Sequence, residues 1–140
     1  MKYNLSLLKN KNVGFQIYRN DEQLRFCSIV KSVKQTKNGI IFNFENSSLE
    51  ISLFVFEHML VRLDEKNNIV WLIQDKDCSY FTSFLGFTMF DTYGFPIEMT
   101  QEIVCEKNMK IDIDGFYVLR KLKKQMSMGT YKNKNAFKGD

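Results

Sequence analysis

The sequence predicts an α+β fold, with a small antiparallel β-barrel or curled meander followed by a carboxy-terminal helical hairpin. An Asn-Gly pair at residues 38–39 separates two apolar runs, apolar residues alternate along residues 49–55, and the apolar spacing becomes helical after Pro96. The chain has 140 residues, of which 44% are apolar, enough for one domain with its own core. We therefore expect strands mainly within residues 12–87 and two helices after them.

The first strands are predicted from alternation and turn chemistry. Val13, Phe15 and Ile17 alternate with other residues until a polar cluster at residues 20–22, and residues 24–33 form a second strand long enough to bend. The Asn-Gly pair favours the positive φ angles of a type I′ turn, which joins hairpin strands. The apolar residues after this turn should share one face: Ile40, Phe42 and Phe44.

The next strands follow at short intervals. Residues 49–55 alternate with one apolar face, and residues 60–63 and 69–73 flank a turn of five polar residues. Residues 80–87 are either a last strand or a short helical start. Five to seven short strands at this spacing predict a small antiparallel barrel.

Two helices are predicted in the second half. The first runs from Pro96 to about Lys107, with Met99, Ile103 and Val104 facing inward, and Asn108 can end it in the left-handed conformation. The second begins near Asp112 or Asp114, either of which can cap it. Its apolar stripe comprises Phe116, Leu119, Leu122 and Met126. Residues 108–111 should join the pair as an αα-hairpin.

Charge is distributed unevenly along the chain. Between Gly115 and Lys138 there is no Asp or Glu, and the basic residues are Arg120, Lys121, Lys123, Lys124, Lys132, Lys134 and Lys138. This asymmetry predicts a polyanionic partner bound through phosphate contacts. The alternative is a solvated helix face followed by a loose tail.

Cysteine and histidine content argues against metal and disulfide frameworks. Cys27, Cys78 and Cys105 are far apart, and His58 is the single histidine. We expect each cysteine to be a small buried apolar residue and His58 to be structural. The amino terminus is too short in its apolar part for a signal peptide, so a cytoplasmic location without membrane contact is expected.

Residues 90–100 carry the most specific residue order in the chain. Tyr93, Gly94, Phe95 and Pro96 are typical of a structural corner, because Gly94 can take a positive φ and Pro96 suits the first turn of a helix. On these grounds alone, the run is a strand-to-helix corner with two aromatic anchors.

The same run resembles a known family. Asp-Thr-Tyr-Gly-Phe-Pro at residues 91–96, followed by Ile-Glu-Met-Thr-Gln-Glu-Ile, is similar to the Asp-Thr-Tyr-Gly-Phe-Pro-φ-Asp-Leu-Thr-x-Glu-Ile segment of alanyl-tRNA synthetases. The resemblance covers about residues 87–127 and leaves residues 1–80 unrecognised. It implies a non-catalytic helical region that lies behind the class II core. In the family this region holds the tRNA acceptor stem.

The resemblance also implies a role for Asp91. In the family an aspartate and an asparagine read the G·U pair near the end of the acceptor stem, and the position of Asp91 in the motif matches that aspartate. Guanine's exocyclic amine is a donor in the shallow groove of an RNA helix, which a carboxylate can reach. The alternative is that Asp91 caps the corner by accepting the amides of Tyr93 or Gly94.

The sequence departs from the family where chemistry would be needed. The basic Gln-Arg-x-Arg-Ala-Arg run of the family is replaced by Lys-Lys-Gln-Met-Ser-Met at residues 123–128. A chain of 140 residues cannot contain the class II activation core, and one histidine cannot supply the editing motifs. No catalytic activity of the chain alone, no cofactor and no metal are expected.

A second surface is open to two interpretations. Six aromatic and basic residues could stack single-stranded bases, although core packing is the favoured role of the aromatic ones. These residues are Tyr18, Arg19, Arg25, Phe54, Phe56 and Trp71.

The sequence thus predicts three parts and two alternative functions. The parts are a β-barrel-like unit at residues 1–86, a synthetase-like helical segment at 87–127 and a flexible basic tail at 128–140. One function is binding of the tRNA acceptor-stem region; the expected site is Asp91, Arg120, Lys121, Lys123, Lys124, Lys132 and Lys134. The alternative is a small protein-interaction module without an RNA role. A detached synthetase piece that works beside a synthetase or another protein subunit is a third hypothesis.

Overall fold

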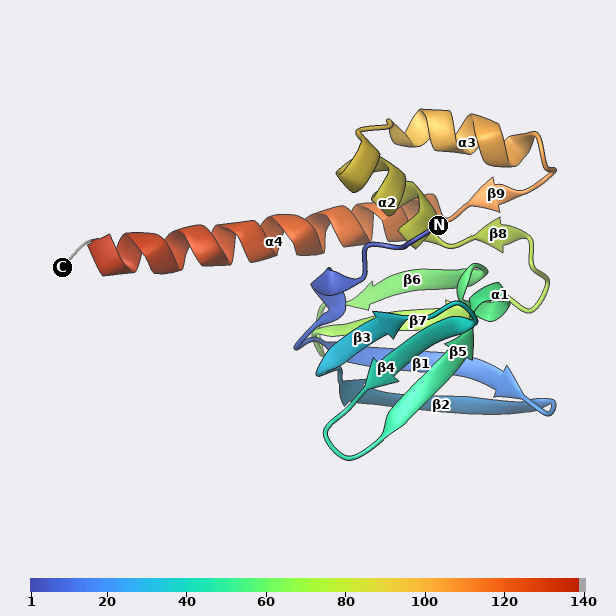
Figure 1. Cartoon of the computed structure of the whole chain (residues 1–140), viewed down its shortest axis with the longest axis horizontal. Helices are drawn as coiled ribbons and strands as arrows, with labels where there is room; N and C mark the ends of the chain where they lie inside the picture. The colour runs from blue at the N-terminus through green and yellow to red at the C-terminus, as the bar shows by residue number, and fades with distance from the viewer. Residues whose placement is uncertain (139–140) are drawn as a thin grey trace.

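Two β-sheets lie beneath a helical layer in this protein, and a third sheet of two short strands lies beside the helices (Figure 1). The structure is a computed structural model that describes the backbone of residues 1–138 and the side chains of residues 1–127. Its strands are β1 Asn12–Arg19, β2 Glu22–Ile29, β3 Ser32–Gln35, β4 Gly39–Asn43, β5 Ser48–Ser52, β6 Met59–Asp64, β7 Ile69–Gln74, β8 Tyr80–Phe81 and β9 Lys110–Ile111. Its helices are the 3₁₀ turn η1 Ser6–Leu8, α1 Leu53–Phe56, α2 Ser83–Tyr93, α3 Ile97–Cys105 and α4 Ile113–Lys138.

The strands form open sheets. The largest sheet has the order β2-β1-β7-β6, a second has the order β3-β4-β5, and β8 pairs with β9. Pairing is antiparallel except for β1 with β7 and β8 with β9. The α+β class is confirmed, whereas a closed antiparallel barrel is not observed in the described part of the chain.

The two larger sheets meet through the alternating residues that the sequence indicated. Val13, Phe15 and Ile17 are buried on the inner face of β1. The Phe15 ring contacts the edge of Phe42 in β4, with 4.9 Å between centroids. This contact places the core between the sheets.

The type I′ turn lies elsewhere than predicted. Asn20 and Asp21 have φ angles of 53° and 64° between the paired residues Arg19 and Glu22, which is the two-residue hairpin geometry. The Asn-Gly pair at 38–39 has no positive φ, so the predicted type I′ turn there is wrong, although the β3–β4 hairpin is confirmed. Glycine is required at position 39 because a Cβ would overlap the carbonyl oxygen of Ile51.

The predicted strand at residues 49–55 ends early. β5 stops at Ser52, whose Oγ accepts a hydrogen bond from the backbone amide of Val55 at 3.2 Å and so caps α1. The helical turn directs Phe56 into the core, where it is fully buried. A helical turn therefore replaces the predicted strand at this point, because Ser52 caps the turn and Phe56 packs in the core.

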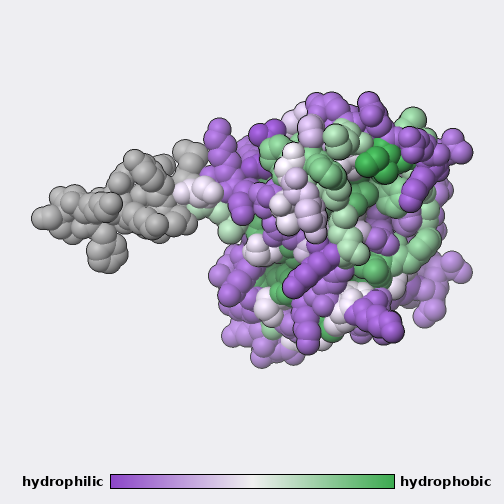
Figure 2. Space-filling model, turned by 45° about the horizontal axis from the view of Figure 1, so that its top comes forward, coloured by the Kyte–Doolittle hydropathy of each residue, from purple (hydrophilic) through white to green (hydrophobic). Residues whose placement is uncertain are grey.

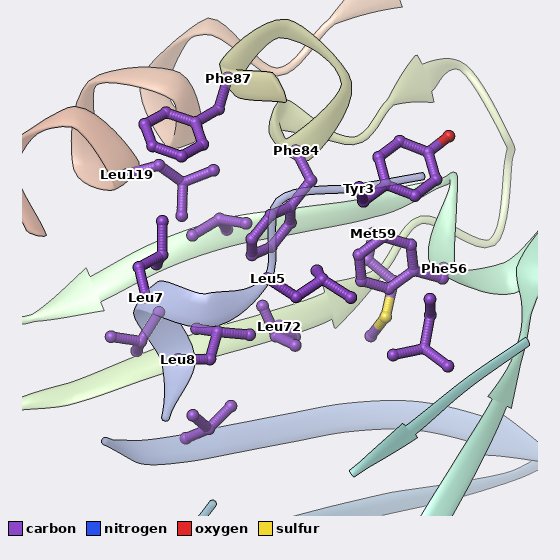
Figure 3. Close-up of a cluster of buried hydrophobic side chains, with 14 of the residues drawn as sticks. Tyr3, Leu5, Leu7, Leu8, Phe56, Met59, Leu72, Phe84, Phe87 and Leu119 are labelled. Atoms are coloured by element: carbon purple, nitrogen blue, oxygen red, sulfur yellow. The ribbon is translucent and has the colours of Figure 1, made fainter. Parts of the chain in front are cut away.

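The amino-terminal segment fills the space between the sheets and the helices. Tyr3, Leu5, Leu7 and Leu8 are buried, and Figure 3 shows them beside residues from α1, α2, α4, β6 and β7. The Tyr3 hydroxyl donates to the carboxylate of Glu57. Burial and this carboxylate together raise the pKa of Tyr3 above its usual range.

The helical layer differs from the predicted hairpin. α4 packs against α2 and β6, while α3 packs against α2, and β9 separates α3 from α4 by pairing with β8. The predicted α3–α4 hairpin is therefore not formed. In the part of the chain that the structure describes, no helix is both long and apolar enough to cross a membrane.

α3 presents a different face to the core than expected. Val104 is buried as predicted, but Met99 and Ile103 are exposed, and the buried positions are Ile97, Thr100 and Val104. Their spacing of three and four is one face of a helix. Figure 2 shows hydrophobic residues reaching the surface on part of the molecule, with hydrophilic residues around them.

α4 confirms most of the predicted apolar stripe. Phe116, Leu119 and Leu122 are buried, whereas Met126 is 40% exposed. The backbone of α4 is helical to Lys138 and extends beyond the rest of the molecule (Figure 1). The last two residues of the tail that was expected to be flexible, together with its side chains from Met128 onward, lie outside the described residues.

The expectation that the three cysteines are buried is wrong. Cys27 lies on an exposed strand and Cys105 ends α3, and both are exposed, while Cys78 is half-buried. All three are free thiols. The prediction failed because composition does not indicate which face of an element a cysteine occupies.

Candidate nucleic-acid interface

The corner at residues 93–96 joins two helices, α2 and α3, rather than a strand and a helix. α2 ends at Tyr93, and Gly94 follows with φ 73° in the left-handed region, as predicted. Its amide donates to the Phe90 carbonyl at 3.0 Å, and the Phe95 amide donates to the Met89 carbonyl at 2.9 Å. These bonds satisfy carbonyls that the helix end leaves free. Pro96 then precedes α3.

The two aromatic residues of the corner are not anchors. Tyr93 is 59% exposed and Phe95 is 37% exposed. The corner is stabilised by backbone hydrogen bonds, which leaves both rings accessible at the surface.

Asp91 lies in the last turn of α2 and connects three parts of the chain. One carboxylate oxygen, Oδ2, accepts a hydrogen bond from Asn4 Nδ2 at 2.6 Å. The same oxygen lies 3.7 Å from Lys123 Nζ on α4. The alternative in which Asp91 caps the corner is wrong, because the Gly94 amide is bonded to backbone carbonyls.

Four of the predicted basic residues gather with Asp91 around one surface cavity. The cavity has a volume of about 470 Å³ and lies between α2 and α4. Its lining residues are Phe87, Phe90, Asp91, Tyr117, Arg120, Lys121, Lys123 and Lys124. We call these eight residues the α2–α4 patch. Lys132 and Lys134, the other two basic residues of the predicted site, have side chains outside the described residues.

The cations of the patch are held by neighbours. The Arg120 guanidinium lies over the ring of Phe90, 4.8 Å from its centroid. Lys121 forms an ion pair with Glu65 in the β6–β7 turn, which lowers the pKa of Glu65 below its ordinary value. With Lys123 beside Asp91, these contacts fix the positions of three positive charges on one side of α4.

Phe87, Phe90 and Tyr117 of the patch and the neighbouring Asn4 were not predicted as site residues from the sequence. Tyr117, which is 54% exposed, lies at helical spacing from Arg120, Lys121 and Lys124, so periodicity could have found it. Asn4 is 87 positions from Asp91, and no local pattern connects them.

Asp112 sets the start of α4 and thereby the position of the patch. Its carboxylate accepts from the Gly115 amide at 3.2 Å as a helix cap, as expected, and from the Val61 amide of β6 at 2.8 Å. Arg62 Nη1 completes the contacts at 2.7 Å. Asp112 is 2% exposed, so the bonds from the two amides are buried, whereas the Arg62 side chain is 40% exposed.

The structure offers binding groups but no grouping for metal chemistry. Among the side chains of residues 1–127, no cluster of three or more His, Cys, Asp or Glu residues could hold a metal ion. His58 is buried, and its Nδ1 lies 2.8 Å from the Tyr80 carbonyl oxygen.

Comparison with known proteins finds a match to the part of the chain that forms this surface. Residues 72–140 match the family model described as tRNA synthetases class II (A). The carboxy-terminal part of the chain is therefore a segment related to class II tRNA synthetases. No solved structure matches the chain.

Individual relatives narrow this relationship to one synthetase. The alanine-tRNA ligase of Microcystis aeruginosa is 35% identical over 72 residues, 51% of this chain and 8% of that protein. That of Nostoc sp. is 41% identical over 46 residues, 33% of this chain and 5% of that protein. That of Dehalococcoides mccartyi is 60% identical over 31 residues, 22% of this chain and 4% of that protein. The chain thus contains an alanyl-tRNA-synthetase-related segment, and it spans less than a tenth of these relatives' length.

Proposed function

We propose that the protein is a non-catalytic RNA-binding protein that contacts the acceptor-stem region of tRNA through the α2–α4 patch. The observation that carries the proposal is the gathering of Arg120, Lys121, Lys123 and Lys124 with Asp91 in the synthetase-related segment. The proposal includes a cytoplasmic location, where tRNA is used in translation.

The charges of the patch suit a phosphate backbone. Arg120 to Lys124 present four cations within two turns of α4, and phosphate contacts of this kind supply affinity without sequence selectivity. On RNA binding, Lys121 and Lys123 leave their ion pairs with Glu65 and Asp91 and contact phosphates. Breaking these pairs costs little free energy, because exposed ion pairs contribute little to stability in water.

Asp91 and Asn4 supply the selective part of the proposed contact. Their side chains touch at the edge of the patch, and Asp91 remains 24% exposed. A carboxylate can accept from the exocyclic amine of guanine, and an amide can both donate and accept. In this proposal Asn4, which lies outside the synthetase-related segment, takes the part of the asparagine beside Asp91.

Salt-dependent binding of tRNA to the purified chain tests the phosphate contacts. Joint replacement of Arg120, Lys121, Lys123 and Lys124 by Gln should weaken binding to all acceptor stems and reduce the salt slope by roughly 2 to 4. A control with the same charge change replaces Arg19, Lys31, Lys34 and Lys37 by Gln, all exposed in or beside β1, β3 and β4, and should keep most of the slope. Absence of binding by the parent at low salt would refute the proposal.

Selectivity tests the role of Asp91 separately. Asp91→Asn should change the preference among acceptor stems that differ in one base pair, with folding nearly unchanged because Asn can still accept from Asn4. Asn4→Ala should change the same preference. If both variants rank the stems as the parent does, the base-reading role is wrong.

A second candidate function rests on the exposed apolar side chains near α3. Tyr93, Phe95, Met99 and Ile103 are all exposed, which is typical of a protein-interaction surface. In this candidate the chain is an accessory module for a synthetase or another protein subunit. Co-purification scored for both tRNA and synthetase polypeptides distinguishes the two, since the accessory role requires the polypeptide and the RNA role requires the tRNA.

A further inference from the structure

The outer face of the β2-β1-β7-β6 sheet is open to solvent in the described part of the chain. Its inner face packs on the second sheet, whereas the outward positions in β2 are exposed and those in β7 are half-buried. One row across the outer face pairs Cys27 with Gly14, Gly14 with Trp71 and Trp71 with Arg62. Gly14 is needed here because a Cβ would overlap the Trp71 ring, which lies flat across β1.

Arg25 covers the other face of this ring. Its guanidinium carbon lies 4.2 Å from the centre of the Trp71 ring, and Arg25 itself is exposed. The result is a layered arrangement of backbone, indole and guanidinium. The outermost layer is a planar cation that faces solvent, and nucleobases stack on such guanidinium planes as well as on aromatic rings.

Two more cation–aromatic pairs border the same face. The Lys76 ammonium lies 4.5 Å from the Tyr18 ring centre, one outward position along β1 from the residue opposite Arg25. The Lys110 ammonium lies 5.9 Å from the Tyr80 ring centre. Lys110 and Tyr80 line a cavity of about 570 Å³ that Arg62 also lines, so the sheet face continues into this cavity.

Charge on this face favours a polyanion. The outward residues include the cations Arg25 and Lys76, whereas Arg62 is paired with Asp112 at 2.7 Å. The acidic side chain among the paired outward positions is Asp64 at the end of β6. Asp64 is occupied by hydrogen bonds from Asn67. Of the six residues that the sequence offered as a stacking surface, Tyr18, Arg25 and Trp71 lie here. Phe56 is in the core, Arg19 donates to the carbonyl of Glu50, and Phe54 is exposed on α1 beside His58.

We propose that this face binds single-stranded nucleic acid, with bases stacked on the Arg25–Trp71 layer and on Tyr18 and with phosphates near Lys76. A positively charged surface with stacking platforms is the arrangement that single strands require. The face is separate from the α2–α4 patch, so the inference goes beyond the proposed tRNA contact and does not depend on it.

The two surfaces are nevertheless adjacent. A shallow groove of about 710 Å³ between them is lined by both Arg62 of the sheet and Lys121 of the patch. One RNA molecule with a duplex next to a single strand could therefore occupy both surfaces.

The single tryptophan of the chain reports directly on this site. A 12-nucleotide oligouridylate at low salt should quench Trp71 fluorescence to saturation, and a blunt duplex RNA of the same length should not. Arg25→Gln should weaken the single-strand affinity about 5- to 50-fold, since stacking on a platform contributes on that scale. Lys76→Gln should weaken it by a smaller factor.

Lys34→Gln is the matched control, because it removes one exposed cation from the other sheet. Equal effects of Lys34→Gln and Arg25→Gln would mean general electrostatic attraction and would overturn the inference, as would the absence of quenching or equal quenching by the duplex. The quadruple Gln variant of α4 should keep the quenching by the single strand. Failure of tRNA binding at the patch and failure of this inference are therefore distinguishable.

Discussion

Gly94 shows how one backbone angle sets the corner. It ends α2 at φ 73°, and a Cβ added there would meet no atom within 4 Å. Any cost of a larger residue at this position is therefore conformational and not steric.

Gly94→Val should lower the free energy of unfolding by about 1 to 3 kcal/mol, because a β-branched residue takes a left-handed conformation only with strain. Gly94→Asn should cost less, since Asn tolerates positive φ. Urea unfolding of both variants measures this difference. Equal stability of the Val variant and the parent would contradict the argument.

Glu65 and Lys121 give a residue-scale test of charge in the patch. The hydrogen bond and charge of Lys121 hold the pKa of Glu65 below its ordinary value of 4.5. A lowered folded-state pKa means that this favourable contribution is present above pH 4.5 and is lost as the pH falls through the folded-state pKa.

Lys121→Gln should therefore return the pKa of Glu65 towards 4.5, measured by NMR titration of the side-chain carboxyl group. Lys124→Gln should leave it unchanged. The same shift in both variants would show that the general field of α4, and not the ion pair, acts on Glu65.

Local chemistry predicted part of the site at this scale. The left-handed Gly94 and the helix cap at Asp112 follow from the preferences of single residues, and both are confirmed. The contact between Asn4 and Asp91 could not be predicted, because it depends on how the amino-terminal segment crosses the molecule. Contacts between residues so far apart in the sequence depend on tertiary packing, which cannot be predicted from a local sequence pattern.

At the scale of elements, Asp112 joins β6 to α4. It caps the helix and accepts the Val61 amide that the edge strand would otherwise leave without a partner in the sheet.

Asp112→Ala should destabilise the protein by about 2 to 4 kcal/mol, the sum of a lost cap and a buried amide left without its acceptor. Asp112→Asn should cost less because its side-chain oxygen still accepts. Thermal unfolding followed by circular dichroism at 222 nm distinguishes them. An Ala variant as stable as the parent would mean that water satisfies these amides.

Strand alternation was predictable, but sheet order was not. Val13, Phe15 and Ile17 alternate as the pattern indicates, since one face of β1 is buried. The parallel pairing of β1 with β7 has no local signal, because these strands are separated by six elements. The α2–α4 packing was missed for the same reason, as α3 and β9 intervene.

At the scale of the whole molecule, the amino-terminal segment makes one continuous core. Leu8 is completely buried, and Figure 3 shows it near Leu7 and Leu72.

Leu8→Ala should lower stability by about 2 to 5 kcal/mol through the cavity it leaves. Unfolding of this variant should remain a single transition when followed by Trp71 fluorescence, in the sheet, and by helical circular dichroism. Two separate midpoints would mean that the sheets and helices fold independently, contrary to a shared core.

The central position of β7 has a consequence for how this chain could be divided. Similarity to the synthetase family begins at residue 72, in the middle of β7, where Leu72 pairs with Phe15 on one side and Val61 on the other. A cut there would sever a strand from both neighbours and expose the residues that α2 and α4 bury. The start of the synthetase-related segment therefore does not coincide with a boundary at which the sheet could be divided. A recombinant fragment should therefore contain the complete sheet, and its ends should not be placed at the limits of the sequence similarity.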